Sequence, residues 1–274
     1  MIPDGNRRYA RSRNVPVTAG HRAGAETAEQ LLEWCVELAV PELTVYGFST
    51  ENFHRDPDER SAILGLIAEK LEELAESDRV HRHEVRIAVF GDRDRLPIDV
   101  RRAATRAEAA TAGYAAHRCN VALAYGGRTA LLDGVQRTLH AVADGRIDPS
   151  AIDVTRLEER LGAVPDRPVD LLVRTGGEQR TSNFLPWRAR GATMVTSPRR
   201  WPAFDRAALL EAFRIHERMR AETVDRDRAR EHAIERLTAS DPDGSRASAA
   251  TAPPRPVSIH GAGRTGRPSA PSDP

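Results

Sequence analysis

The sequence of 274 residues has almost no lysine: Lys70 is the only one, and the other 40 of its 41 basic residues are arginine. This bias by itself carries little functional weight. The 40 acidic residues leave a net charge of +1. A chain so nearly neutral has no global positive field, and we therefore expect no nucleic-acid partner.

Cysteine and long apolar runs are also scarce. Cys35 and Cys119 are the only cysteines, which predicts reduced, buried thiols in a cytoplasmic protein, and no paired Cys/His spacing indicates a zinc site. No run of 18 apolar residues predicts a membrane span, and no signal peptide opens the chain. No Walker loop and no GxGxxG motif points to nucleotide binding.

Strand and helix patterns alternate along most of the chain. This order predicts a single α/β domain with a mainly parallel central sheet and helices on both faces. The domain is expected over residues 1–238. Residues 239–274 hold seven prolines and only two large apolar residues, so we predict a disordered tail. Strands are expected at residues 43–48, 85–90, 120–123, 171–173 and 193–196, and helices at 19–38, 59–77, 97–116, 129–143, 154–161 and 204–237.

A polar loop follows the predicted strand at residues 171–173. Arg174 and Arg180 offer forked donors, Gly176 and Gly177 permit close backbone approach, and hydroxyls follow. This chemistry suits a diphosphate. A plain strand-to-helix turn with surface arginines is an equal alternative on this stretch alone.

Three further polar loops fall near the ends of predicted elements. Residues 4–9 (Asp-Gly-Asn-Arg-Arg-Tyr) look like a turn before a helix, or like a carboxylate beside cations for a metal-bound phosphate. Residues 49–55 and 125–128 follow two strands, and ligands of parallel sheets bind at such ends. His21 begins a helix, where it either meets an anion or is a cap or surface residue.

Five segments in this order resemble the signature blocks of the cis-prenyltransferases, the undecaprenyl diphosphate synthase-like isoprenyl transferases. They are Asp-Gly-Asn-Arg-Arg-Tyr-Ala from residue 4, Gly-His-Arg-Ala-Gly from 20, Tyr-Gly-Phe-Ser-Thr-Glu-Asn-Phe from 46, Tyr-Gly-Gly-Arg from 125, and Arg-Thr-Gly-Gly-Glu-Gln-Arg-Thr-Ser-Asn-Phe from 174. Each block alone is a weak signal. The five in order, covering residues 1 to about 222, are specific.

The resemblance implies a homodimer with a hydrophobic tunnel beside the sheet, whose walls would include Ile63, Ile67 and Leu71. It implies Mg²⁺-dependent condensation of isopentenyl diphosphate with an allylic diphosphate, giving a cis double bond and pyrophosphate, with membrane contact for release of the lipid product. Asp4 would hold the metal and Asn52 would accept the proton. The substrate-binding residues would be Gly5, Asn6, Arg7, Arg8, Tyr9, His21, Ser49, Thr50, Glu51, Phe53, Arg55, Arg174, Arg180, Thr181 and Ser182.

Several positions depart from the family pattern. Val17, Ala124 and Ala130 replace an arginine, an asparagine and an acid, and residues 217–220 replace an Arg-x-Gly ending. Thr193 stands where a neighbouring subunit's metal-associated glutamate belongs, so we expect Mg²⁺ to bind mainly with the substrate diphosphate. A specialised short-chain coupling enzyme and a non-catalytic partner subunit remain alternatives. Residues 1–3 match only the end of the family's first strand, so we expect either that the native start lies upstream or that the first strand is a stub that weakens the loop carrying Asp4.

Overall fold

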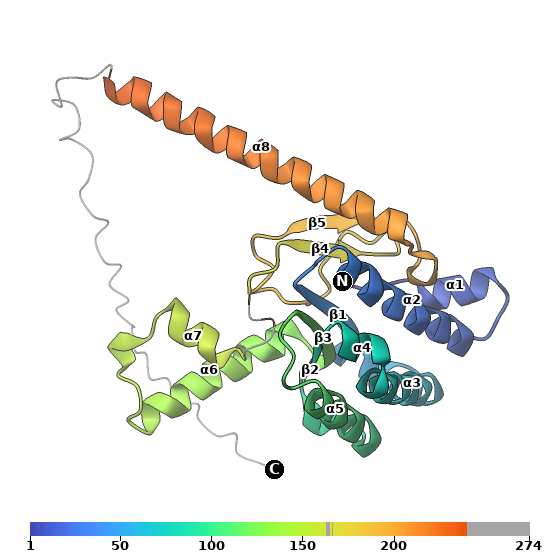
Figure 1. Ribbon diagram of the computed structural model, residues 1–274. Helices are drawn as coiled ribbons and strands as arrows, with labels where there is room; N and C mark the ends of the chain where they lie inside the picture. The colour runs from blue at the N-terminus through green and yellow to red at the C-terminus, as the bar shows by residue number, and fades with distance from the viewer. Residues whose placement is uncertain (163–164, 166, 240–274) are drawn as a thin grey trace, which may run out of the picture. The chain divides into compact units, whose positions relative to one another are not determined.

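The computed structural model describes residues 1–162, 165 and 167–239 (Figure 1). The chain divides into two units, Met1–Glu222 and Thr223–Pro274. The second unit, as far as it is described, is the C-terminal part of helix α8 (Arg206–Ala239). The predicted disordered tail, apart from Ala239, lies outside the described residues.

The central sheet is parallel, as predicted. Its order is β1 (Glu42–Ser49), β3 (His117–Tyr125) and β2 (Val85–Phe90), and β4 (Leu171–Arg174) pairs with β5 (Thr193–Thr196) in a second parallel pair. The opening residues lie between the two groups. Ile2 N–H donates to Val173 O at 2.8 Å, and Tyr46 N–H donates to Met1 O at 3.0 Å. The first two residues therefore link β1 to β4.

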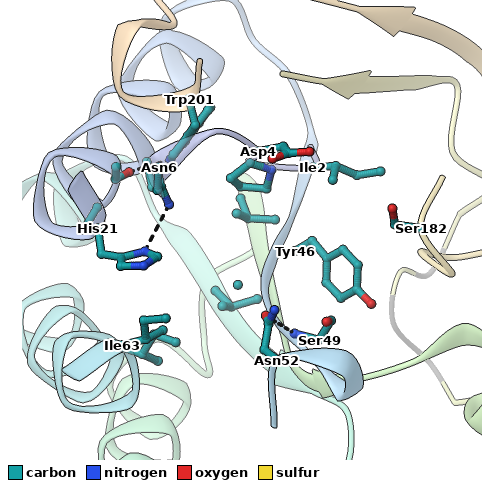
Figure 2. Close-up of a pocket in the computed structure, with 18 of the residues that line it drawn as sticks. Ile2, Asp4, Asn6, His21, Tyr46, Ser49, Asn52, Ile63, Ser182 and Trp201 are labelled. Atoms are coloured by element: carbon teal, nitrogen blue, oxygen red, sulfur yellow. Dashed lines mark hydrogen bonds between the residues drawn. The ribbon is translucent and has the colours of Figure 1, made fainter. Parts of the chain in front are cut away.

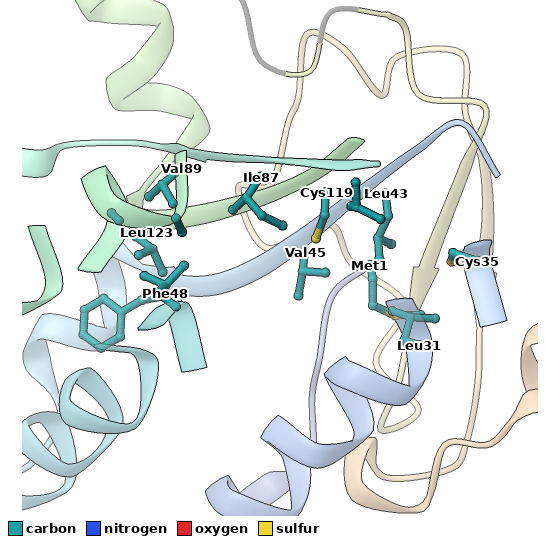
Figure 3. Close-up of a cluster of buried hydrophobic side chains, with 14 of the residues drawn as sticks. Met1, Leu31, Cys35, Leu43, Val45, Phe48, Ile87, Val89, Cys119 and Leu123 are labelled. Carbon is teal, nitrogen blue, oxygen red and sulfur yellow. The ribbon is translucent and has the colours of Figure 1, made fainter. Parts of the chain in front are cut away.

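Alternate residues of each strand face opposite sides of the sheet, as strand geometry requires. One side carries Leu43, Val45, Ile87, Val89 and Leu123 against Leu31 of α2 (Figure 3). The other side carries a smaller cluster around Tyr46, Ala122, Leu172 and Phe184. The burial of both faces explains why the strands read as nearly continuous apolar runs. Both cysteines are free and buried, as predicted.

Helices α2 (Val17–Glu37), α3 (Pro57–Glu76) and α5 (Ile98–Ala110) carry the larger cluster, with α3 beside both α2 and α5 (Figure 1). The start of α3 is fixed by sequence. Asp56 accepts the N–H groups of Asp58 and Glu59 at 2.9 and 3.3 Å, and Pro57 occupies the first turn. This cap positions Glu59, which the site uses.

The remaining helices are shorter or lie later in the chain. They are α1 (Asn6–Ser12), α4 (Asp78–Arg82), α6 (Gly127–Ala143) and α7 (Val154–Arg160), with 3-10 turns η1 (Thr50–His54), η2 (Arg93–Arg95), η3 (Pro149–Ala151) and η4 (Trp201–Ala203). Across the described part of the chain, no helix combines the length and apolar character that crossing a membrane requires.

The helix α1 corrects one expectation, because only a turn was predicted for residues 4–9. Gly5, the N-cap residue of α1, adopts a φ of 111°, a backbone conformation that glycine tolerates best. The helix begins at the next residue. Gly20 of α2 then allows close packing, since a Cβ there would lie 2.5 Å from Asn6 O. Tertiary packing thus stabilises a helix with no apolar periodicity of its own.

Candidate active site

A cavity of about 910 Å³ opens at the carboxyl ends of β1 and β4 and continues between α2 and α3. Figure 2 shows Asp4, His21, Asn52 and Ser182 around it, from four separate segments. Its deeper walls are apolar and include the predicted Ile63, Ile67 and Leu71 with Leu32 and Leu74. Of the predicted site residues, eleven line the cavity: Asp4, Asn6, His21, Ser49, Thr50, Glu51, Asn52, Arg55, Arg174, Arg180 and Ser182.

Asp4 is held by both its backbone and its carboxylate. Its N–H donates to Thr175 Oγ1 at 2.8 Å, and its carbonyl accepts the N–H of Trp201 at 2.9 Å. Arg174 donates to Oδ2 at 2.8 Å, and Arg8 donates to Oδ1 at 3.0 Å. Burial opposes ionisation, but the two guanidinium groups outweigh it and keep the pKa of Asp4 below its usual value. The carboxylate is therefore charged, with one guanidinium donor on each oxygen, and its side chain is 29% exposed.

Arg174 connects this carboxylate to the loop after β4. The side chain is 4% exposed, and its Nη1 donates to Ser182 Oγ at 2.5 Å and also to Arg180 O. Gly176 has a φ of 83°, and a Cβ there would lie 2.5 Å from Arg8 Nη2. Arg8 Nη1 donates to Gly176 O at 2.8 Å. The glycine thus makes room for the side chain of Arg8 of α1.

A second charged cluster joins α2 to α3 at the cavity wall. His21 Nε2 lies 3.0 Å from Glu59 Oε1, and Arg55 Nη1 lies 2.5 Å from the same oxygen. Asn6 Nδ2 lies 3.4 Å from His21 Nδ1, which suits a neutral ring whose Nε2–H donates to Glu59. Burial lowers the pKa of His21, Arg55 and Arg7 lower it further, and Glu59 raises it in part.

The turn after β1 is closed by its own side chains. Asn52 Oδ1 accepts the N–H of Ser49 at 2.9 Å, in a capping box with the Ser49 hydroxyl. Asn183 Nδ2 donates to Glu51 Oε1 at 3.2 Å, while its Oδ1 accepts the N–H of Arg128 at 2.8 Å. Asn183 thereby joins the three loops that follow β1, β3 and β4.

Six predicted site residues lie outside the cavity lining: Gly5, Arg7, Arg8, Tyr9, Phe53 and Thr181. Arg8 still contacts Asp4, and Arg7 lies 3.8 Å from Glu59. Phe53 packs instead on Phe48, with ring centroids 5.0 Å apart, and under the guanidinium of Arg95. Phe53 thus packs against the hydrophobic core, while its neighbours in the same motif line the cavity.

Sequence reasoning missed four residues that hold the site together: Glu59, Thr175, Asn183 and Trp201. The spacing of four between Arg55 and Glu59 was an available signal, because such pairs face each other on a helix. Trp201 Nε1 donates to Gly24 O at 2.7 Å, although the two residues are 177 positions apart in the sequence. No local sequence pattern predicts such a contact.

The charges of the site suit an anion better than a bare cation. Among the described residues, no group of three or more His, Cys, Asp or Glu side chains could hold a metal ion. Asp4 is the carboxylate that faces Arg8 and Arg174, and Arg55 and Arg180 also line the cavity. A divalent ion that arrives with a phosphate needs only one or two protein carboxylates, so Asp4 fits Mg²⁺ bound as its diphosphate complex.

The chain is similar in sequence to proteins of one known family. Residues 2–223 match the family model of undecaprenyl diphosphate synthase. Two relatives carry the name tritrans,polycis-undecaprenyl-diphosphate synthase (geranylgeranyl-diphosphate specific). The Halobacterium salinarum protein is 51% identical over 220 residues, covering 79% of this chain and 72% of its own. The Archaeoglobus fulgidus protein is 42% identical over 215 residues, covering 78% and 86%.

Solved structures agree with this match. Lavandulyl diphosphate synthase from Lavandula x intermedia, in complex with dimethylallyl diphosphate, is 28% identical with a TM-score of 0.74, covering 78% of this chain and 92% of that one. A probable undecaprenyl diphosphate synthase from Campylobacter jejuni is 28% identical with a TM-score of 0.62, covering 72% and 89%.

Proposed function

The chain belongs to the undecaprenyl diphosphate synthase family of cis-prenyltransferases. We propose that the cavity with Asp4 at its mouth and Leu74 in its apolar wall is the active site. Its reaction is the condensation of isopentenyl diphosphate with an allylic diphosphate. A carbon–carbon bond forms at the allylic carbon, the bond from that carbon to its diphosphate breaks, and isopentenyl diphosphate loses a proton. The observation that carries the proposal is the continuity of an arginine-lined mouth with apolar walls.

The two diphosphates are assigned to the two charged clusters. The allylic diphosphate binds at the start of α1 and α2, near Asn6, Arg8 and His21. Isopentenyl diphosphate binds at Arg174, Arg180 and Ser182. Arg8 and Arg174 now hold Asp4, so an arriving diphosphate competes with that carboxylate for both guanidinium groups. Asp4 already orients both arginines, of which Arg174 is 4% and Arg8 is 42% exposed, and donors held in place in this way stabilise charge on a departing pyrophosphate with little reorganisation.

Asn52 is assigned to the proton that isopentenyl diphosphate loses. The supporting observation is its place on the cavity wall, three residues beyond the end of β1. Its Oδ1 already accepts the N–H of Ser49, which fixes the amide within the turn. Asn52 therefore orients the reacting carbon and relays the proton towards the diphosphate.

Mg²⁺ is assigned to Asp4. When bound, the ion neutralises negative charge that develops on the leaving diphosphate. Asp4 would offer one carboxylate oxygen to the ion, and the substrate diphosphate and water would supply its other ligands. Thr193, at the start of β5, is outside the cavity lining and lies 3.0 Å from His216 Nδ1 through its hydroxyl. The metal therefore binds with the substrate rather than before it.

The primer is assigned from the relatives. Proteins 51% and 42% identical to this chain are named as specific for geranylgeranyl diphosphate, which favours that allylic substrate here and a long polycis product. Chain elongation also suits a cavity that runs on between two helices. The non-catalytic alternative is disfavoured because Asp4, Asn52, Arg174, Arg180 and Ser182 all line the cavity together.

A homodimer through α6 is the proposed assembly. Leu132, Val135 and Leu139 lie on one face of this helix and are 56%, 43% and 59% exposed. Exposed apolar side chains at this spacing mark an association surface. We propose a second copy of the chain as the partner, because in a twofold dimer the same face of each subunit packs against the other.

The test of the site is Asp4→Ala. Turnover of labelled isopentenyl diphosphate with Mg²⁺ should fall by at least about 100-fold, as for other groups that stabilise charge in the transition state. Circular dichroism should show the fold intact, and Glu69→Ala, which alters an exposed carboxylate of α3, should keep the parent rate. Undiminished turnover in Asp4→Ala would remove Asp4 from the mechanism.

A further inference from the structure

The loop that follows β4 ends in a backbone conformation that few residues adopt. Ser182, Asn183 and Leu185 have φ angles of 47°, 62° and 48°, in the left-handed region that residues other than glycine rarely occupy. Asparagine enters this region at low cost, because its short side chain can form local hydrogen bonds. Such strain persists where surrounding contacts impose it, and it is common at ligand-binding sites. Ser182 is assigned to isopentenyl diphosphate, so the contacts of its neighbour Asn183 help to fix that binding group.

Asn183 holds the two neighbouring loops with its side chain and its carbonyl. Its Nδ2 donates to Glu51 Oε1 at 3.2 Å, and its Oδ1 accepts the N–H of Arg128 at 2.8 Å. Its carbonyl accepts the N–H of Gly127 at 2.8 Å. A Cβ at Gly126 would lie 3.1 Å from Asn183 Nδ2, so this glycine keeps the space that the asparagine side chain needs.

The carboxylate that Asn183 contacts is charged. Burial opposes the ionisation of Glu51, but hydrogen bonds from its own backbone N–H, from two hydroxyls and from the Asn183 amide outweigh it and lower its pKa. A hydrogen bond to a charged acceptor is stronger than one to a neutral acceptor. The bond is exposed to water, so we expect it to act on the orientation of the two loops more than on the stability of the fold.

This hydrogen bond connects two groups with different tasks in the reaction. Ser182, which precedes Asn183, is assigned to the diphosphate of isopentenyl diphosphate. Asn52, which follows Glu51, is assigned to the proton that this substrate loses. Figure 2 shows Ser182 and Asn52 on separate segments around the same cavity. The proton leaves the carbon next to the one that bears the diphosphate, so both groups must be aligned on one short substrate.

We propose that Asn183 is a positioning residue: through Glu51 it fixes Asn52 relative to the loop that holds isopentenyl diphosphate. Its effect is on alignment, and a misplacement of about 1 Å can reduce a rate by roughly 100-fold. Loss of the contact therefore lowers kcat for the condensation while both diphosphates still bind. This inference rests on the condensation activity proposed above.

The test is Asn183→Gly, because glycine adopts the same backbone conformation and removes the side chain without adding charge. Turnover is measured with Mg²⁺, geranylgeranyl diphosphate, and isopentenyl diphosphate that is unlabelled or deuterated at the carbon that loses the proton. We expect kcat to fall by about 10- to 100-fold, KM for both substrates to change little, and the deuterium isotope effect on kcat to exceed that of the parent. The control is Asn14→Gly, an asparagine with a φ of 54° outside the cavity lining, which should match the parent.

Reversal of the hydrogen bond provides a second test. Asn183→Asp should lower kcat, because it places a carboxylate against Glu51 while it keeps the acceptor for the N–H of Arg128. The further change Glu51→Gln supplies an amide donor to that carboxylate. Asn183→Asp/Glu51→Gln should therefore recover much of the lost kcat, although Glu51→Gln alone should not raise the rate of the parent.

Three results would overturn the proposal: a parental kcat in Asn183→Gly, a double variant no faster than Asn183→Asp, or a raised KM for isopentenyl diphosphate with unchanged kcat, which would assign Asn183 to binding alone. If circular dichroism shows that Asn183→Gly does not fold, Glu51→Ala breaks the same bond without altering the loop after β4. It should show the same fall in kcat and the larger isotope effect, and parental values there would refute the role of the bond. Absence of any product from the parent protein would instead contradict the proposed function.

Discussion

Asp4 is the residue at which the two halves of the site meet. Its carboxylate joins Arg8 of α1 to Arg174, which ends β4 and lies 170 residues after Asp4. Sequence reasoning predicted a carboxylate near cations, because the motif places two arginines after it. The identity of the distant partner comes from the parallel position of Ile2 beside Arg174, which no local pattern contains.

Glu59 opposes the lowering of the His21 pKa that burial causes. Its carboxylate raises the pKa of His21 against burial and two arginines. Glu59→Gln removes that charge, so the pKa of His21 should fall further below 6.5 and the ring should stay neutral to lower pH. An NMR pH titration of the His21 ring measures this.

The matched variant for this titration is Glu69→Gln, an exposed carboxylate on the same helix that pairs with Arg22. It should leave the His21 titration unchanged. A His21 pKa that is equal in the parent and Glu59→Gln would mean that the two side chains do not interact in solution.

At the scale of elements, sequence patterns were sufficient where helices and strands were long. The helical spacing of apolar residues predicted α2 and α3. Apolar runs predicted β1 and β2 with bounds within one residue of those observed. The helices α1 and α4 were not predicted, whereas α7, which has seven residues like α1, was predicted at residues 154–161. Helix α5 ends at Ala110 rather than near 116, and the hydroxyl of Thr111, the next residue, accepts the N–H of Ile87 on β2.

The packing of α1 on α2 depends on glycine. A Cβ at Gly24 would lie 2.5 Å from Asn6 Oδ1 and 2.8 Å from the Trp201 ring. Gly24→Ala should therefore cost about 1–3 kcal/mol of unfolding free energy, the usual cost of overpacking, and should weaken diphosphate binding by moving Asn6. Denaturant unfolding and binding of inorganic pyrophosphate measure the two effects.

Gly65→Ala on α3 is the matched comparison. No atom lies within 4 Å of a Cβ at Gly65, which is exposed in a helix interior. This change should stabilise the protein by roughly 0.5–1 kcal/mol through helix propensity. Similar unfolding energies for the two variants would show that α1 does not pack closely on Gly24.

At the scale of the whole molecule, the fold class followed from the order of elements, and the apolar cavity beside the sheet was expected only from the resemblance to the cis-prenyltransferases. The ion pairs that join distant helices were not predicted. Nothing in the spacing of Glu29 and Lys70 indicates that helices 41 residues apart in sequence would join through them. The association of two copies of the chain is also a property at this scale, and we propose that it occurs through the exposed face of α6.

Leu132→Glu/Leu139→Glu tests that face. Two carboxylates on the exposed stripe of α6 should repel across a twofold interface and convert a dimer to a monomer, as measured by light scattering after gel filtration. Ile98→Glu, at a residue 72% exposed on α5, should not change the mass. A dimer that persists in the double variant would place the interface elsewhere.

The most direct test of the account is the product that the whole chain makes. The protein is incubated with Mg²⁺, labelled isopentenyl diphosphate and, in separate reactions, allylic primers that include geranylgeranyl diphosphate, and the products are identified by mass spectrometry and NMR. We predict a labelled polyprenyl diphosphate with new cis double bonds and one pyrophosphate released for each unit added. No labelled product with any primer, together with stimulation of a second family member, would contradict the account and favour a non-catalytic partner.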